Sequence, residues 1–243
     1  MSSEIFLLFL FALFAVGAVA IHIISRKKNK PERISAWKKF LVYFFLLYSI
    51  FLSILYAPVL FRAICFLVVL GGCFEIVRLQ QKPHQRLAWG KFCLYFSIYM
   101  AMAVLFLFFS FESGKIQLLT VFAVCTFDAF SQLSGQLFGQ RKIAPRISPN
   151  KTLGGLVGGA CLALLFGVIV NFNSEFGIMG VIILIFFVVA ASFVGDLLAS
   201  YVKRQYAVKD YGSLLPGHGG ILDRFDSLIA AGAVLFLIKF IWL

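Results

Sequence analysis

Charged residues are scarce in this chain, and they lie in short stretches between long apolar runs. Only 13% of the residues are charged, whereas 62% are hydrophobic and the mean hydropathy is +0.98. Each polar stretch is well below the ~50 residues of a small independent domain. This composition excludes a soluble protein and a separate soluble domain, and it predicts a single membrane domain over residues 1–243.

Cysteine is also sparse. The five cysteines are odd in number, lie in apolar runs and show no C-x-x-C spacing; they are Cys65, Cys73, Cys93, Cys125 and Cys161. This pattern argues against disulfides and thiolate metal ligands, and it favours small core residues.

Acidic residues are too few to balance the basic ones, which leaves a formal charge of +12. In a soluble protein this excess would suggest a nucleic-acid partner. Here the basic residues gather in alternate loops, at 25–39, 78–91, 141–151 and 203–224. The positive-inside bias therefore places these loops in the cytoplasm and both termini outside. The remaining charge suits anionic membrane lipids, and no nucleic acid is expected.

The apolar runs predict an all-α, polytopic integral membrane protein of about eight transmembrane helices. Each run approaches the ~20 residues that a helix needs to cross ~30 Å of hydrocarbon. Proline at Ala57-Pro58 either separates the second run from the third or kinks one continuous hydrophobic hairpin. Glu4 replaces a basic start, so the first run is expected to remain as a helix. The runs are 5–24, 40–57, 59–77, 92–111, 116–133, 153–171, 176–195 and 227–242.

A charged and glycine-rich stretch follows the seventh run, at the edge of the predicted membrane. If the helix continues past Gly195, then Asp196, Ser200 and Lys203 fall on one stripe. Asp223 and Asp226 form a second one-faced pair at the start of the last run. These acids suit Mg²⁺, which prefers oxygen ligands and bridges carboxylates to phosphates. Alternatively, the last two acids only favour a helix N-terminus.

Two glycine clusters have different interpretations. The turn 216–220 permits close backbone approach to phosphate oxygens. The run 154–159 predicts close helix packing, because it lacks the Gly-Lys-Ser/Thr ending of a Walker A loop. In the first half of the chain, Glu75 is expected to pair with Arg78 at helical spacing.

Two blocks of motifs carry a resemblance to the phosphatidate cytidylyltransferases (CDP-diacylglycerol synthases), over about residues 128–226. In two places the sequence departs from the family pattern: Asp128 is followed by Ala-Phe-Ser-Gln instead of Thr/Ser-Gly-Ala-Tyr, and Gly154 stands where Glu or Gln is common. The matching residues are Ser200, Lys203-Arg204, Lys209-Asp210, His218-Gly219-Gly220 and Asp223-Arg224-Phe225-Asp226, with Asp128, Gly135-Gln136-Leu137-Phe138-Gly139 and the loop from Pro145 to Thr152 upstream.

The resemblance implies transfer of a cytidylyl group from CTP to phosphatidic acid or a related lipid phosphate. The metal-binding acids are then Asp196, Asp223 and Asp226, for one Mg²⁺ or two. The implied catalytic residues are Ser200, Lys203, Arg204 and His218. The implied substrate-binding residues are Asp128, Arg141, Lys151, Lys209, Asp210, Gly219 and Gly220.

The expected location is the bacterial cytoplasmic membrane, with a polar active site facing the cytoplasm. Three alternatives stay open: transfer to an isoprenoid phosphate, a CTP-using lipid kinase, and a non-enzymatic paralogue that binds lipid. A transporter fits less well, because its polar residues should lie near the bilayer midplane. The sequence also leaves a homodimer open.

Overall fold

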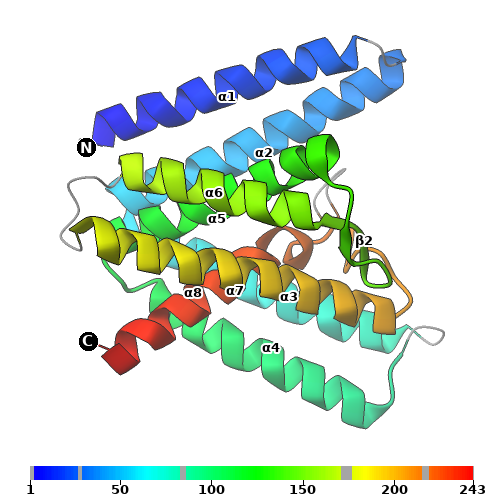
Figure 1. The fold of residues 1–243 in the computed structure, drawn as a ribbon. Helices are drawn as coiled ribbons and strands as arrows, with labels where there is room; N and C mark the ends of the chain where they lie inside the picture. The colour runs from blue at the N-terminus through cyan, green and yellow to red at the C-terminus, as the bar shows by residue number, and fades with distance from the viewer. Residues whose placement is uncertain (1–2, 27–28, 83–85, 171–176, 215–218, 243) are drawn as a thin grey trace.

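The computed structural model describes residues 3–26, 29–82, 86–170, 177–214 and 219–242 (Figure 1). Over these residues the chain forms eight helices, which correspond in order to the eight predicted runs, and one short hairpin. The predicted all-α class is confirmed. The elements are α1 (Ser3–Ser25), α2 (Lys30–Tyr56), α3 (Pro58–Gln81), α4 (Trp89–Phe109), α5 (Gly114–Phe138), β1 (Lys142–Ala144), β2 (Ser148–Thr152), α6 (Leu153–Val170), α7 (Gly177–Gln205) and α8 (Leu222–Trp242).

Most of these helices have the length and composition of membrane spans. Within the described residues, six helices, α2 to α7, are long and apolar enough to cross a bilayer. Large apolar side chains also cover the outer surface, such as Phe66 and Leu67 on α3 and Phe186 on α7. Such a surface suits lipid rather than water. The chain is an α-helical integral membrane protein, and spans formed by α1 and α8 stay predictions.

The second and third runs form two helices, not one kinked hairpin. Ala57 has φ −143° and ψ 69°, outside the helical region, and Pro58 is the first residue of α3. A residue before proline is driven out of the helical conformation, while proline itself suits a helix start. The prediction of two separate segments is therefore confirmed.

Helix α8 lies at the centre of the bundle, packed against α3, α4, α5 and α7. Its small residues permit close approach by its neighbours. A Cβ on Gly195 of α7 would lie 2.2 Å from the Cβ of Ala230, and one on Gly232 would lie 2.7 Å from the ring of Phe106. Small residues are what membrane helices use to pack closely.

The glycine run at the start of α6 packs against α5, as predicted. A Cβ on Gly155 would lie 2.6 Å from the carbonyl oxygen of Ser131, and one on Gly159 would lie 2.9 Å from that of Phe127. Gly154, where the sequence departs from the family pattern, also lies against α5: a Cβ there would lie 2.9 Å from the carbonyl oxygen of Phe138. A longer side chain at this position would force α5 and α6 apart.

The hairpin β1–β2 is an element that the sequence did not predict. Its strands pair antiparallel, with Lys142 opposite Thr152 and Ala144 opposite Ser148. The turn closes with a hydrogen bond of 3.1 Å from the Ile147 N–H to the Ala144 carbonyl, and Pro145 stands at its second position. Proline pre-sets the backbone angle needed there. The hairpin holds the predicted Ser-Pro-x-Lys-Thr loop against α7.

Candidate active site

The candidate site lies around the last third of α7, which contacts the hairpin strand β2 and packs against α8 (Figure 1). Helix α7 runs past the membrane edge expected at residue 195 and ends at Gln205. Ala207 then takes a positive φ of 54°, and the Val208 N–H donates to the Lys203 carbonyl over 3.0 Å. This ending satisfies a terminal carbonyl of α7 and turns the chain back toward α8.

The predicted stripe on α7 is confirmed. The Ser200 hydroxyl, one turn after Asp196, donates to Oδ1 of that acid over 3.3 Å. Lys203, a further turn on, is buried and donates to Asp223 of α8 over 2.8 Å. The stripe therefore contacts the hairpin through Asp196, as described next, and α8 through Lys203.

Lys151 of β2 forms an ion pair with Asp196, with 2.6 Å between Nζ and Oδ2. Its ammonium also lies 4.6 Å from the centre of the Phe193 ring, which favours a cation. Lys151 and Asp196 are 17% and 34% exposed, so water or a ligand reaches both. An anion that displaced the Asp196 carboxylate would find Lys151 already in place.

A cavity of about 280 Å³ opens beside this ion pair, between α5, β2, α6 and α7. Its lining includes two residues of the predicted departures from the family pattern, Ser131 and Gln132. The polar side chains on its wall are Asp128, Ser131, Gln132, Ser148, Asn150, Lys151, Thr152 and Asp196. This is the polar cavity of the site, and its wall brings residues of the upstream motif block together with Asp196 of α7.

Three acids from three helices come together next to the polar cavity. The charge of Asp196 acts on both Asp128 of α5 and Asp226 of α8. The Ser227 side chain forms a hydrogen bond with Asp128, and its backbone N–H donates to Asp226 over 2.8 Å. Because like charges repel, this group favours a bound cation.

Asp223 stands apart from those three acids. Its Oδ1 accepts from Lys203, and its Oδ2 accepts from the backbone N–H groups of Tyr211 and Gly220, over 2.8 and 2.9 Å. The side chain is only 2% exposed. This arrangement argues against the metal role predicted for Asp223, because both of its oxygens are already occupied. The structure instead gives it the task of holding Tyr211 and Gly220 at the start of α8.

The remaining predicted residues lie around this centre. Arg204 donates to the carbonyls of Ile147 and Val208, so it ties the hairpin to the end of α7 rather than facing the acids. Gly219 has a φ of 91°, and a Cβ there would lie 3.1 Å from Asp223. His218 is outside the described residues. The exposed residues, which line none of the cavities described here, are Arg141, Lys209 and Asp210.

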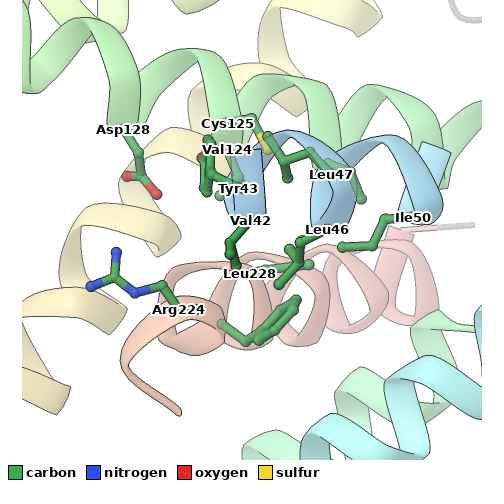
Figure 2. Close-up of a pocket in the computed structure, with 12 residues that line it drawn as sticks. Val42, Tyr43, Leu46, Leu47, Ile50, Val124, Cys125, Asp128, Arg224 and Leu228 are labelled. Atoms are coloured by element: carbon green, nitrogen blue, oxygen red, sulfur yellow. The ribbon is translucent and has the colours of Figure 1, made fainter. Parts of the chain in front are cut away.

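Arg224 lies in the motif with no predicted role, yet the structure brings it to the site. Figure 2 shows it facing Asp128 at one end of a narrow pocket, of about 30 Å³, between α2, α5 and α8. Tyr43 of α2 also borders this pocket. The position of Arg224 between two acids of the motif was a signal for it, whereas no pattern in the sequence pointed to Tyr43.

A second, mainly apolar cavity of about 180 Å³ lies between α3, α4, α7 and α8, away from the narrow pocket that α8 forms with α2 and α5. Asp226 borders it, and so does Tyr211. Burial, followed by the charges of Asp226 and Asp223, raises the pKa of the Tyr211 phenol well above its ordinary value. The phenol therefore stays protonated and donates to the Ala199 carbonyl over 3.0 Å. Asp226 is the acid of the site that borders this apolar cavity.

The acids fit a metal ion that takes some of its ligands from the protein and the others from a bound substrate. Among the described residues, no group of three or more His, Cys, Asp and Glu side chains is arranged to hold a metal ion unaided. Asp128 and Asp196 nevertheless present carboxylates to one cavity. Mg²⁺ commonly takes one or two carboxylates and completes its shell with phosphates and water. The donor set suits this mode of binding.

Comparison with known proteins agrees with the family resemblance of the motifs. The model of the cytidylyltransferase family matches residues 1–242. A phosphatidate cytidylyltransferase of Brucella abortus biovar 1 is 37% identical over 171 residues, which are 70% of this chain and 63% of the relative. One of Haemophilus influenzae is 45% identical over 125 residues, which are 49% of this chain and 43% of the relative. The chain thus spans less than two thirds of the length of these relatives.

Proposed function

Because the chain belongs to the cytidylyltransferase family, we propose that it transfers a cytidylyl group from CTP to phosphatidic acid, giving CDP-diacylglycerol and pyrophosphate. The observation that carries the proposal is the polar cavity, where Lys151 and Asp196 form an ion pair beside Asp128. Relatives from three bacterial genera, Brucella, Haemophilus and Staphylococcus, bear the name phosphatidate cytidylyltransferase.

In the proposed reaction, an oxygen of the lipid phosphate forms a bond to the α-phosphorus of CTP. The bond from that phosphorus to the oxygen bridging it to the β-phosphorus breaks, and pyrophosphate leaves with the electron pair. The attacking phosphate is a monoester with a second pKa of about 6, so no general base is required near neutral pH. Catalysis then consists of positioning the two phosphates and offsetting their charge.

The residues of the polar cavity have the chemistry for this task. Lys151 offers an ammonium to the triphosphate. Asp128 and Asp196 are the ligands that we propose for Mg²⁺, and the Asp226 carboxylate lies near them as a further negative charge. When bound, Mg²⁺ would offset negative charge on the phosphates. Ser200 fixes the orientation of Asp196 through its hydrogen bond.

The two cavities suit the two halves of the reaction. The polar cavity has the ionic and amide side chains that a nucleotide triphosphate requires. The mainly apolar cavity suits an acyl chain of the lipid, and Asp226 lies at its border. In this arrangement the phosphates of both substrates meet beside α7, the helix that lines both cavities.

The assay that tests the proposed function uses purified protein, labelled CTP, Mg²⁺ and one lipid at a time. We expect pyrophosphate and a CDP-lipid from phosphatidic acid. Faster formation of a CDP-lipid from an isoprenoid phosphate would favour that substrate. Release of CDP with phosphorylation of diacylglycerol would indicate a lipid kinase. A folded protein inert toward every lipid and nucleotide would support the non-enzymatic paralogue.

The membrane orientation is tested by labelling single cysteines in a variant that lacks the five native ones. Because basic loops stay in the cytoplasm, cysteines at Asn29 and Ser213 should react only from the cytoplasmic side, and one at Ser113 only from outside. All three positions are exposed. The readout is modification by a membrane-impermeant maleimide in intact cells and in inverted vesicles. Labelling of Asn29 and Ser113 from the same side would contradict the proposed orientation.

Substrate preference should depend on Ser131 and Gln132, which line the polar cavity and depart from the family pattern. Ser131→Ala combined with Gln132→Tyr should shift the ratio of kcat/KM between phosphatidic acid and an isoprenoid phosphate by roughly ten- to a hundredfold. The Mg²⁺ requirement should not change. The control is Leu133→Ala, at a neighbouring side chain that is 48% exposed. An unchanged ratio in the double variant would exclude these residues as specificity determinants.

A further inference from the structure

Glu75 of α3 is a buried acid that contacts the start of α8. Glu75 is only 1% exposed. The two oxygens of its carboxylate accept hydrogen bonds from the backbone N–H groups of Ile221 and Leu222, each over 2.9 Å. Leu222 is the first residue of α8. The first N–H groups of a helix have no partner within the helix, and a negative charge is favourable at that end. Glu75 therefore caps α8 from 147 residues away. The backbone of α8 is thus the hydrogen-bonding partner of Glu75, and the charge of Arg78, the predicted partner, acts on Glu75 as well.

The loop before α8 is shaped around the Glu75 carboxylate. A Cβ on Gly220 would lie 2.5 Å from both of its oxygens, and a Cβ on Gly212 would lie 2.7 Å from one of them. No side chain larger than hydrogen fits at either position without displacing the acid. One turn earlier on α3, a Cβ on Gly71 would lie 2.6 Å from the Ile221 side chain. Helix α3 thus holds this loop at two successive turns.

Three consecutive backbone N–H groups at the loop end are divided between two acids. The Gly220 N–H donates to Asp223, whereas those of Ile221 and Leu222 donate to Glu75. Asp223 is in turn held by Lys203 of α7. The start of α8 is therefore fixed from α3 on one side and from α7 on the other. Asp226 lies one turn into α8, so the contacts that fix the start of α8 also fix the position of Asp226 near Asp196.

We propose that Glu75 is a positioning residue for cytidylyl transfer: it fixes the start of α8, and so sets the place of Asp226 relative to Asp196. The inference rests on the proposed function. It assigns a role in the reaction to a residue of the first half of the chain, outside the motif blocks. Glu75 contacts the loop and not the cavities, so it acts through α8 and is not itself a catalytic residue.

The test compares Glu75→Gln and Glu75→Asp with a matched control at the other end of the bundle. Gln117→Leu is that control, because Gln117 is equally buried and donates to the carbonyls of Phe109, Ser110 and Glu112. Two quantities are measured on the full-length protein in detergent. The first is hydrogen exchange of the amides at 220–222, and the second is kcat per folded molecule with its dependence on Mg²⁺ concentration.

We expect Glu75→Gln to accelerate exchange at 220–222, because a neutral amide cannot accept from both N–H groups as the carboxylate does. It should lower kcat by roughly ten- to a hundredfold, the scale of an ångström-sized misplacement of reacting groups. A higher Mg²⁺ concentration should be needed for half-maximal activity. Glu75→Asp keeps the charge and should recover part of both losses. Gln117→Leu should change neither quantity, although it lowers thermal stability.

Unchanged exchange at 220–222, or an unchanged kcat per folded molecule, in Glu75→Gln would overturn the proposal. If Glu75→Gln does not fold, Glu75→Asp decides by the same two measurements, since its shorter side chain should withdraw from Ile221 and Leu222. If the wild-type protein shows no transferase activity, the proposed function is wrong, and so is the catalytic part of this inference. The exchange experiment would still decide whether Glu75 anchors α8.

Discussion

Asp196→Asn is expected to reduce kcat by roughly a hundred- to a thousandfold while the protein remains folded. The substitution conserves size and leaves an acceptor for Ser200, but it removes the charge that interacts with Lys151, Asp128 and Asp226. Loss of one charge-stabilising group from an active site commonly costs about 2.7–4 kcal/mol of transition-state stabilisation. Steady-state turnover with CTP and phosphatidic acid measures the loss, and thermal unfolding in detergent checks the fold.

A matched control for this variant is Glu32→Gln, which removes an exposed carboxylate from the first turn of α2. It should retain wild-type turnover. Titration with Mg²⁺ then separates two roles for Asp196. A metal ligand should make the remaining activity need more Mg²⁺, whereas a residue that only holds Lys151 in place should not. Wild-type kcat in Asp196→Asn would refute the proposed acid site.

Asp223→Asn is expected to act on stability, in contrast to Asp196→Asn. It removes one partner from a pair in which the Asp223 and Lys203 side chains are 2% and 10% exposed. Breaking a buried pair in this way typically costs about 3–5 kcal/mol, because the remaining charge is left uncompensated. Chemical unfolding in detergent should therefore show a strongly destabilised protein, with activity lost in proportion to the unfolded fraction.

A double-mutant cycle with Lys203→Met makes this prediction sharper. If the cost of Asp223→Asn comes from the stranded ammonium, the double variant should recover part of the stability lost in the single one. Wild-type stability in Asp223→Asn, together with a changed Mg²⁺ requirement, would instead support the metal role that the sequence pattern predicted for Asp223.

The helices and the α7 stripe could be predicted because each depends on local sequence. A run of apolar residues is enough to specify a membrane helix, and spacing along one helix specifies a face. The same spacing placed Asp196 and Ser200 within hydrogen-bonding distance. The family resemblance also implied that Lys151 and Asp196 share a site, although they are far apart in the sequence.

The partners of the acids could not be predicted, because they depend on how the helices pack. Spacing paired Asp223 with Asp226, yet in the structure Asp223 binds Lys203 and the loop, while Asp226 lies near Asp196 and Asp128. Spacing also predicted only Arg78, on the same helix, as the partner of Glu75, whereas its hydrogen bonds come from Ile221 and Leu222 at the start of α8. The hairpin could not be predicted for another reason: β1 has only three residues, and β2 is polar with a proline at its second position, so no alternating pattern marks them.

The central place of α8 has a consequence for how the protein is made. Helices α3, α4, α5 and α7 all precede α8 in the sequence and pack around it, so a ribosome releases the wall of the bundle before its centre. Until α8 arrives, Glu75 and Lys203 face an interior without their partners, and a buried unpaired charge is costly. The early helices must therefore stay loosely associated in the membrane and close around α8 as it inserts. Asp226 of α8 can then join Asp128 and Asp196 only after all the other acids of the site have been made.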